Sequence, residues 1–181
     1  MPGLREALRE DAKVTCLHRG ERFQFRSRAD TLWQILRLMW VSDAFFAHAL
    51  YRVRSTLARR GVPILPRLCH KLSMATAQVS IGDPVVMHAG VYIIHGQIVL
   101  DGIVEVGHGC VIGPWTSIGL QSGSVQGPTL GANVFVGSGA KILGPRKVGN
   151  NSIIGANAVV TKDVPEGATV GGIPAEERDS G

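Results

Sequence analysis

An aliphatic residue returns at every sixth position along the second half of the chain, and this period constrains the fold more than any other feature. The run extends from Val106 to Val160 and is interrupted once, at Ser124. Its members are Val106, Ile112, Ile118, Leu130, Val136, Ile142, Val148, Ile154 and Val160. A period of six fits neither an α-helix, which repeats every 3.6 residues, nor a strand, which repeats every two. It predicts a triangular coil of three short strands, each of which turns one aliphatic side chain toward a narrow interior.

The residues between these positions support the same coil. Glycine directly follows seven of the aliphatic residues, and the fourth position after each is usually small, as at Cys110 and Ala140. Glycine and asparagine accept the left-handed backbone that the corners require. Eighteen residues make one coil, so residues 79 to about 164 supply between four and five coils, which stack as repeats do. An earlier run, formed by Ile81, Met87, Ile93 and Val99, has the same period in a frame shifted by one residue.

The first 72 residues have a different composition. They contain 14 Lys and Arg against 6 Asp and Glu, whereas the remainder contains 5 against 8. Capping signals predict helices from Asp30 or Thr31 to Trp40 and from Ser42 or Asp43 to Arg60, and a shorter helix over Pro66–Ser73. We therefore expect a helical segment over residues 1–75, a β-helix over 76–175 and a tail over 176–181. No nucleic-acid-binding motif accompanies the basic residues, so we expect a solvated helix face and no nucleic acid partner.

Cysteine usage and hydropathy indicate the compartment. Cys16, Cys69 and Cys110 lie far apart and are odd in number, which is typical of a reducing cytosol and of neither a zinc knuckle nor a redox pair. The N-terminus lacks the basic-then-apolar order of a signal peptide. The most apolar stretch, Leu32 to Tyr51, carries too many polar groups for a membrane span. We expect a cytoplasmic protein.

Longer sequence strings resemble the hexapeptide-repeat acyltransferases, and within them the serine O-acetyltransferase group. The strings begin at Gly137 (GSGAKILG), Ile154 (IGANAVVTKDVP) and Gly171 (GGIPA), and the likeness covers roughly residues 46 to 175, including Tyr51 and Arg52. The resemblance implies a left-handed parallel β-helix that assembles as a homotrimer. It also implies O-acetyl transfer, with acetyl-CoA as co-substrate between neighbouring coils and no metal.

Transfer from a thioester to a hydroxyl requires a base that takes the hydroxyl proton, and histidine is suited to this near neutral pH. His18 lies in a polar leader, His48 and His70 are expected to be surface or partly packed residues on helices, and His88 and His108 fall at coil corners. His95 aligns with the histidine of the family string D-H-x-x-G. We therefore assign His95 as the general base. Asp83 is a candidate for orienting its ring, although a turn role in Gly82-Asp83-Pro84 is an alternative.

The chain departs from the family at the polar positions of the acceptor site. Ser80 stands where the family has a supporting Asp, Ile94 stands where it has the Asp before the base, and Gln126-Gly127-Pro128 replaces R-H-P. A zwitterionic amino acid needs countercharges, so we expect a saccharide or another non-serine alcohol as acceptor. True serine acetylation in cysteine biosynthesis is the alternative. Trp115, Gln126 and Ser80 are the candidate acceptor-binding residues, and packing at the trimer interface is the alternative role for Trp115. A loop is expected within Leu120–Thr129.

The coenzyme site is assigned by resemblance. Ser138 and Ala156 are eighteen residues apart, as are Gly139 and Asn157, so each pair is expected to stack on successive coils and to admit the pantetheine arm. Lys162 matches a family lysine that reaches the CoA phosphates. Two other classes remain open: a zinc-dependent β-helix like the γ-carbonic anhydrases, using His88, His95 and His108, and a scaffold without catalysis.

Overall fold

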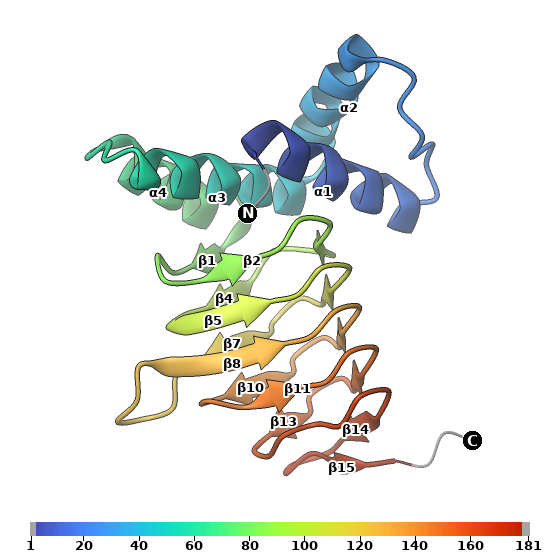
Figure 1. Cartoon of the computed structure of the whole chain (residues 1–181), viewed down its shortest axis with the longest axis vertical. Coiled ribbons are helices and arrows are strands. Elements are labelled where there is room, and N and C mark those ends of the chain that lie inside the picture. Colours follow the sequence, from blue (N-terminus) through green and yellow to red (C-terminus); the bar gives the residue numbers. More distant parts are fainter. Residues whose placement is uncertain (1–2, 179–181) are drawn as a thin grey trace.

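The computed structural model of the chain describes residues 3–178 and consists of a helical layer stacked on one end of a parallel β-helix (Figure 1). Residues 1–2, and residues 179–181 of the expected tail 176–181, lie outside the described residues. The helical layer comprises α1 (Leu4–His18), α2 (Arg28–Val41), α3 (Asp43–Arg59) and α4 (Leu65–Ala77). The helices pack directly on the first coil, and Ala44, Ala47 and Tyr51 share one core cluster with the β-helix. The expected division into a helical segment and a separate β-helix domain near residue 75 therefore stays a prediction.

Three sheets form the sides of a triangular prism, as the six-residue period predicts. Sheet A contains β1 (Val79–Ile81), β4 (Ile98–Leu100), β7 (Ser117–Gly119), β10 (Lys141–Leu143) and β13 (Val159–Val160). Sheet B contains β2 (Val86–Met87), β5 (Ile103–Val106), β8 (Gln126–Leu130) and β11 (Lys147–Val148). Sheet C contains β3 (Tyr92–Ile93), β6 (Val111–Ile112), β9 (Phe135–Val136), β12 (Ile153–Ile154), β14 (Thr169–Gly171) and β15 (Glu176–Glu177). Turns between consecutive strands form the A–B, B–C and C–A edges. All pairings are parallel except that of β14 with β15.

The aliphatic residues of the six-residue period form the core of the prism. All nine members of the run from Val106 to Val160 are buried, and they stack in register from coil to coil. Cys110 fills one of the small-residue positions, where its thiol donates a hydrogen bond to the Gly131 carbonyl oxygen, 3.1 Å away. Burial raises the pKa of the Cys110 thiol to about 11, so this group stays protonated at neutral pH.

One extra residue at the first C–A turn explains the shift between the two frames. Ile93 pairs with Ile112, nineteen residues later, whereas Leu100 pairs with Ile118, eighteen residues later. The run formed by Ile81, Met87, Ile93 and Val99 was expected to be buried throughout, but its last member is not. Val99 points outward and is 46% exposed, while Leu100 is fully buried and takes the core position. The expectation for Val99 was wrong because the extra residue lies before it.

The expected helices are present, with different ends. The Ser27 side chain caps α2 by accepting a hydrogen bond from the Asp30 backbone N–H, so α2 begins before the expected Asp30 or Thr31 cap. Ser42 caps α3 as expected, by accepting from the Phe45 N–H. The shorter third helix extends to Ala77, where Gln78 adopts a left-handed conformation and ends it. This end of α4 contacts the first C–A turn, where the Gln97 N–H donates to the Ala77 carbonyl oxygen.

Helix α1 was not predicted from the sequence. Its buried residues are Ala7, Asp11, Ala12, Thr15 and Cys16, which follow helical spacing but include two polar side chains. A search for apolar periodicity therefore misses it. Asp11 is buried because it accepts hydrogen bonds from Arg52 Nε (2.8 Å), Arg52 Nη2 (3.1 Å) and the Gly90 N–H (2.8 Å).

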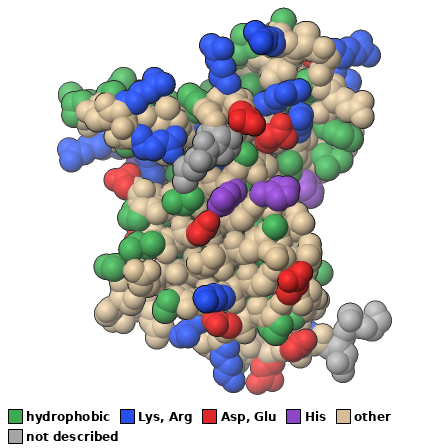
Figure 2. Space-filling view, in the orientation of Figure 1, with side chains coloured by type: hydrophobic (Ala, Val, Ile, Leu, Met, Phe, Trp, Pro, Cys, Tyr) green, Lys and Arg blue, Asp and Glu red, His purple; other side chains and the backbone are tan. Residues whose placement is uncertain are grey.

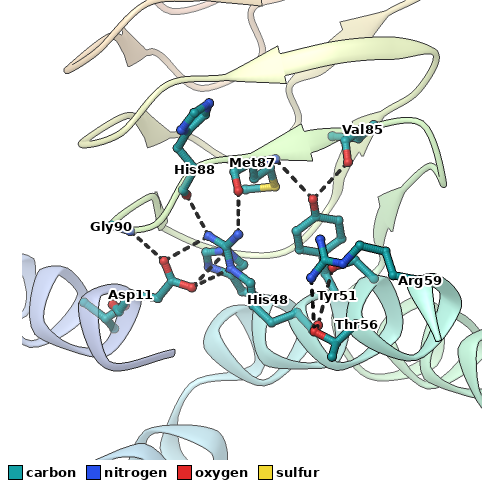
Figure 3. Close-up of polar contacts among 12 residues, drawn as sticks. Asp11, His48, Tyr51, Thr56, Arg59, Val85, Met87, His88 and Gly90 are labelled. Atoms are coloured by element: carbon teal, nitrogen blue, oxygen red, sulfur yellow. Dashed lines mark hydrogen bonds and ion pairs between the residues drawn. The ribbon is translucent and has the colours of Figure 1, made fainter. Parts of the chain in front are cut away.

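Arg52 and Tyr51 of α3 fix the helical layer to the first coil. Figure 3 shows Tyr51 beside Val85 and Met87, and Asp11 beside Gly90. The buried Arg52 guanidinium donates to the carbonyl oxygens of Met87 (2.5 Å) and His88 (2.7 Å) as well as to Asp11. The Tyr51 hydroxyl donates to the Val85 carbonyl oxygen and accepts from the Met87 N–H. We call the Asp11 and Arg52 side chains, together with their backbone partners, the Asp11–Arg52 clamp.

His48 lies beside this clamp and is fully buried, which corrects the expectation of a surface or partly packed residue. Its Nε2 atom lies 3.5 Å from Asp11 Oδ2 without a hydrogen bond. Burial lowers the pKa of His48 from 6.5 to about 4, against the opposing attraction of Asp11. The imidazole is therefore neutral at neutral pH, and its contact with Asp11 is not an ion pair.

Candidate active site

His95 projects from an enlarged corner of the first coil. Four residues, Ile94 to Gln97, separate β3 from β4 at this C–A turn, whereas three separate the corresponding core positions Ile112 and Thr116 in the next coil. The turn is held by the Ile94 N–H, which donates to the Ile112 carbonyl oxygen at 3.0 Å. The His95 side chain is exposed. The enlarged turn therefore presents an imidazole outside the regular wall of the prism.

The end of α4 fixes this turn from the other side. The Gln97 N–H donates to the Ala77 carbonyl oxygen at 3.0 Å. A Cβ atom on Gly96 would collide with the same carbonyl group, so the close approach of the two segments requires glycine. The position of His95 thus depends on the packing of α4 against the first coil.

A groove of about 450 Å³ lies between this turn and the helical layer. The end of α1, the junction of α2 with α3, and the end of α4 form its opposite wall. Its polar side chains are His95, Gln97, Gln78, Thr76, Arg19, Ser42 and Asp43. Within residues 3–178, no side chain forms a hydrogen bond with the His95 ring. The groove places Arg19, whose Nε donates to Glu21 Oε1 at 2.9 Å, and Asp43 on the same surface as an accessible imidazole.

Sequence reasoning missed Arg19 and Asp43 as site residues. Arg19 follows a helix that was not predicted, and Asp43 was considered only as a helix cap. They line one groove because three helices pack together there, and no local spacing in the sequence encodes that packing. The sequence therefore contains no signal that would have identified Arg19 and Asp43. Their proximity to His95 becomes visible only in the folded structure.

A column of left-handed residues follows the C–A edge beyond His95. Gln97, Trp115, Gly139 and Asn157 occupy equivalent corners with φ angles of 64°, 64°, 76° and 56°. The Trp115 N–H donates to the Gln97 carbonyl oxygen at 2.9 Å, so Trp115 lies one coil beyond the turn that carries His95. A tryptophan in this conformation costs about 1–2 kcal/mol relative to glycine. Trp115 is nevertheless 60% exposed, and retained strain of this kind is typical of functional positions.

The predicted coenzyme residues divide between two edges. The stacking of Ser138 on Ala156 and of Gly139 on Asn157 is confirmed, since β10 and β13 pair with an eighteen-residue offset and the Asn157 N–H donates to the Ser138 carbonyl oxygen. These four residues lie on the C–A edge with His95. Lys162 is exposed on the A–B edge, after β13.

The A–B edge also carries Asp83 and the expected loop. The loop occupies residues 120–125, and Gln126 begins β8 immediately after it. Ser80 lies in sheet A, where its register partner is Val99. Asp83 is highly exposed, and its Oδ1 atom lies 3.7 Å from Arg54 Nε. The chain therefore does not bring Asp83 to His95, because the two residues lie at different corners of the same coil.

The three candidate zinc ligands are also separated. His88 and His108 lie on the B–C edge, away from the turn that carries His95. His88 Nε2 lies 2.9 Å from Glu105 Oε1. In the part of the chain that the structure describes, no group of three His, Cys, Asp or Glu side chains is placed to hold a metal ion.

Comparisons with known proteins agree with this architecture. A family model described as bacterial transferase hexapeptide (six repeats) matches residues 127–162. The serine acetyltransferase of Synechococcus elongatus is 38% identical over 143 residues, which are 77% of this chain and 58% of that protein. The serine acetyltransferase of Helicobacter pylori strain J99 is 33% identical over 148 residues, which are 80% of this chain and 84% of that protein. This chain thus spans less than two thirds of the Synechococcus relative.

A solved structure extends the likeness over the helical layer. The serine acetyltransferase of Brucella abortus strain S19, in complex with coenzyme A, superposes with a TM-score of 0.79 at 27% sequence identity. The superposition covers 94% of this chain and 66% of that chain.

Proposed function

Because the chain belongs to the serine acetyltransferase family of hexapeptide-repeat proteins, we propose that it is an acyltransferase that moves the acetyl group of acetyl-CoA to the hydroxyl of serine. The saccharide acceptor expected from the sequence finds no support among these relatives. Serine, the alternative acceptor, fits them better. The proposal rests on one observation above all, which is the presence of His95, Arg19 and Asp43 in the same groove.

Arg19 and Asp43 answer the objection that the family's countercharges are missing. Serine carries an ammonium and a carboxylate, and each needs an opposite charge when it leaves water. Asp43 supplies an anion at the start of α3, and Arg19 supplies a cation at the end of α1. In this assignment Asp43 binds the ammonium and Arg19 binds the carboxylate, which turns the serine hydroxyl toward the imidazole.

His95 then acts as a general base in a direct transfer. Its imidazole takes the proton of the serine hydroxyl while the hydroxyl oxygen bonds to the thioester carbonyl carbon. The tetrahedral intermediate collapses with cleavage of the carbon–sulfur bond, and the imidazolium returns the proton to the departing CoA sulfur. The products are O-acetylserine and CoA, and the enzyme needs neither a covalent intermediate nor a metal for this balance.

The distribution of predicted residues over two edges supports a homotrimer with shared sites. His95, Trp115 and the small residues of the C–A edge would line one wall of a crevice. Lys162, Gln126 and the loop of residues 120–125 lie on the A–B edge, so a neighbouring copy would supply them. The small side chains of Ser138 and Ala156 leave room for the pantetheine arm. We propose that the protein works in the cytoplasm, since Cys16, Cys69 and Cys110 are free thiols.

The test is an acceptor panel with the purified full chain, in which CoA release is followed with serine, with other hydroxyl amino acids and with sugars. We expect serine to give the highest kcat/KM. We also expect Arg19→Gln and Asp43→Asn each to raise the KM for serine about tenfold or more with little change in the KM for acetyl-CoA. Arg60→Gln, outside the groove, is the matched control. Turnover of sugars but not serine refutes the acceptor, and CoA binding without any turnover refutes the activity.

A further inference from the structure

Helix α2 carries an apolar face that no other element of residues 3–178 covers. We call Leu32, Trp33, Leu36 and Trp40 the α2 outer face, and their exposed fractions are 58%, 65%, 53% and 89%. On the opposite side of the helix, Leu38 is fully buried in a cluster with Ala12, Cys16 and Phe45. The helix therefore carries apolar side chains on two opposite sides, with Gln34 and Arg37 between them, and only one of these apolar sides is buried against the rest of the chain.

The second observation is a groove of about 890 Å³ between α1 and α2. Apolar side chains form much of its lining, and one of them, Leu32, belongs to the α2 outer face. The charged residues of the groove are Arg5, Arg9, Arg26, Arg28 and Glu6. Four guanidiniums thus face a single carboxylate. Of the acidic residues nearby, Asp30 is held by Arg22 and Glu10 by Lys13.

The charge and the apolar surface lie at the same end of the molecule. Figure 1 shows α1 and α2 at the end opposite β15, with α2 projecting away from the β-helix. In Figure 2, Lys and Arg side chains gather over this end, whereas acidic and basic groups are mixed over the β-helix. A partner for this end must therefore offer both an apolar region that contacts the indole rings and anionic groups that pair with the guanidiniums.

We propose that the α2 outer face docks on the surface of an anionic lipid bilayer. Trp33, Trp40 and the two leucines would enter the interface between headgroups and acyl chains, where indole rings are favoured. Arg5, Arg9, Arg26 and Arg28 would pair with lipid phosphates around them. A second copy of the chain is a poorer fit, because a symmetric contact would bring two sets of four arginines together. The docking is peripheral: no helix among residues 3–178 is long and apolar enough to cross a membrane.

The experiment uses the full chain with two kinds of vesicle, one of phosphatidylcholine alone and one in which roughly a third of the lipid is phosphatidylglycerol. Sedimentation measures the bound fraction, and far-UV circular dichroism checks the fold of each variant. We expect binding to the anionic vesicles that weakens with salt. Each basic residue near an anionic surface contributes about fivefold, so the double variant Arg26→Gln/Arg28→Gln is expected to bind about 25-fold more weakly.

Two further variants separate the apolar contribution from the charge. Trp33→Gln/Trp40→Gln is expected to lose vesicle binding by tenfold or more, because the indole rings supply the apolar contact. Ile64→Gln, an exposed apolar residue before α4, is the matched control and is expected to bind as the wild type does. Absence of binding to anionic vesicles overturns the proposal. So does a drop in oligomer size, measured by light scattering without lipid, when Trp33 and Trp40 are replaced, because a second copy then covers the face. Acetyl transfer in lipid-free solution is independent of this outcome.

Discussion

Removing the buried carboxylate of the Asp11–Arg52 clamp is expected to destabilise the protein strongly. In Asp11→Ala, Arg52 keeps its hydrogen bonds to the Met87 and His88 carbonyl oxygens, but its charge loses the only carboxylate that it contacts within residues 3–178. The Gly90 N–H, which donates to Asp11 Oδ1, loses its acceptor at the same time. Both groups are buried, so water does not restore the lost interactions.

The magnitude follows from this burial. Breaking a buried ion pair by removing one partner costs about 3–5 kcal/mol, because the remaining charge stays in a medium of low polarity. We therefore expect the free energy of unfolding to fall by about 3–5 kcal/mol. Urea unfolding followed by far-UV circular dichroism measures the change, since the helical signal reports on the layer that the clamp holds.

Two controls make the experiment decisive. Glu10→Ala, on the same helix, removes an exposed pair with Lys13 and is expected to cost no more than about 1 kcal/mol. In the double variant Asp11→Ala/Arg52→Met, the loss is expected to fall short of the sum of the two single losses by about 2 kcal/mol, because the residues act as a pair. A loss below about 1 kcal/mol in Asp11→Ala, or full additivity, would refute the reasoning.

Three other predictions concern the protonation of His48 and the backbone around the active-site turn. Because the pKa of His48 falls from 6.5 to about 4 on folding, the unfolded chain binds the extra proton, so stability is fully present above about pH 6.5 and decreases by about 3 kcal/mol as the pH falls to 4. His48→Leu should flatten this slope in urea unfolding, and an unchanged slope contradicts the assignment. Trp115→Gly relieves left-handed strain, so the free energy of unfolding should not decrease while kcat/KM falls; a marked loss of stability would instead indicate a packing role. Gly96→Ala should lower the unfolding free energy by about 2 kcal/mol or more and reduce activity, because the new methyl group meets the Ala77 carbonyl; wild-type behaviour would contradict the close approach.

The β-helix was predictable from the sequence because each coil repeats the same packing requirement. Ile112, Val136 and Ile154 occupy equivalent buried positions in successive coils, so aliphatic residues recur periodically in the sequence. The prediction was wrong at Val99, where one extra residue at the first C–A turn changes the frame. That same residue enlarges the corner that carries His95.

The helical layer and the groove were less predictable because their determinants are not periodic. Helix α1 was missed since Asp11 and Thr15 take buried positions that a pattern search expects to be apolar. Arg19 and Asp43 meet the first coil only through helix packing. Asp83 lies away from His95 because the strands β2 and β3 separate the two corners of the coil. Resemblance to a family motif does not predict this separation.

The most direct test of the proposed chemistry is the rate of CoA release with serine in His95→Asn, compared with the wild type at saturating acetyl-CoA. Asparagine keeps a polar side chain of similar size but does not act as a base near neutral pH. We predict a fall in kcat of about 100-fold or more, with acetyl-CoA binding unchanged. A variant that releases CoA with serine at the wild-type rate would contradict the assignment of His95 as the base.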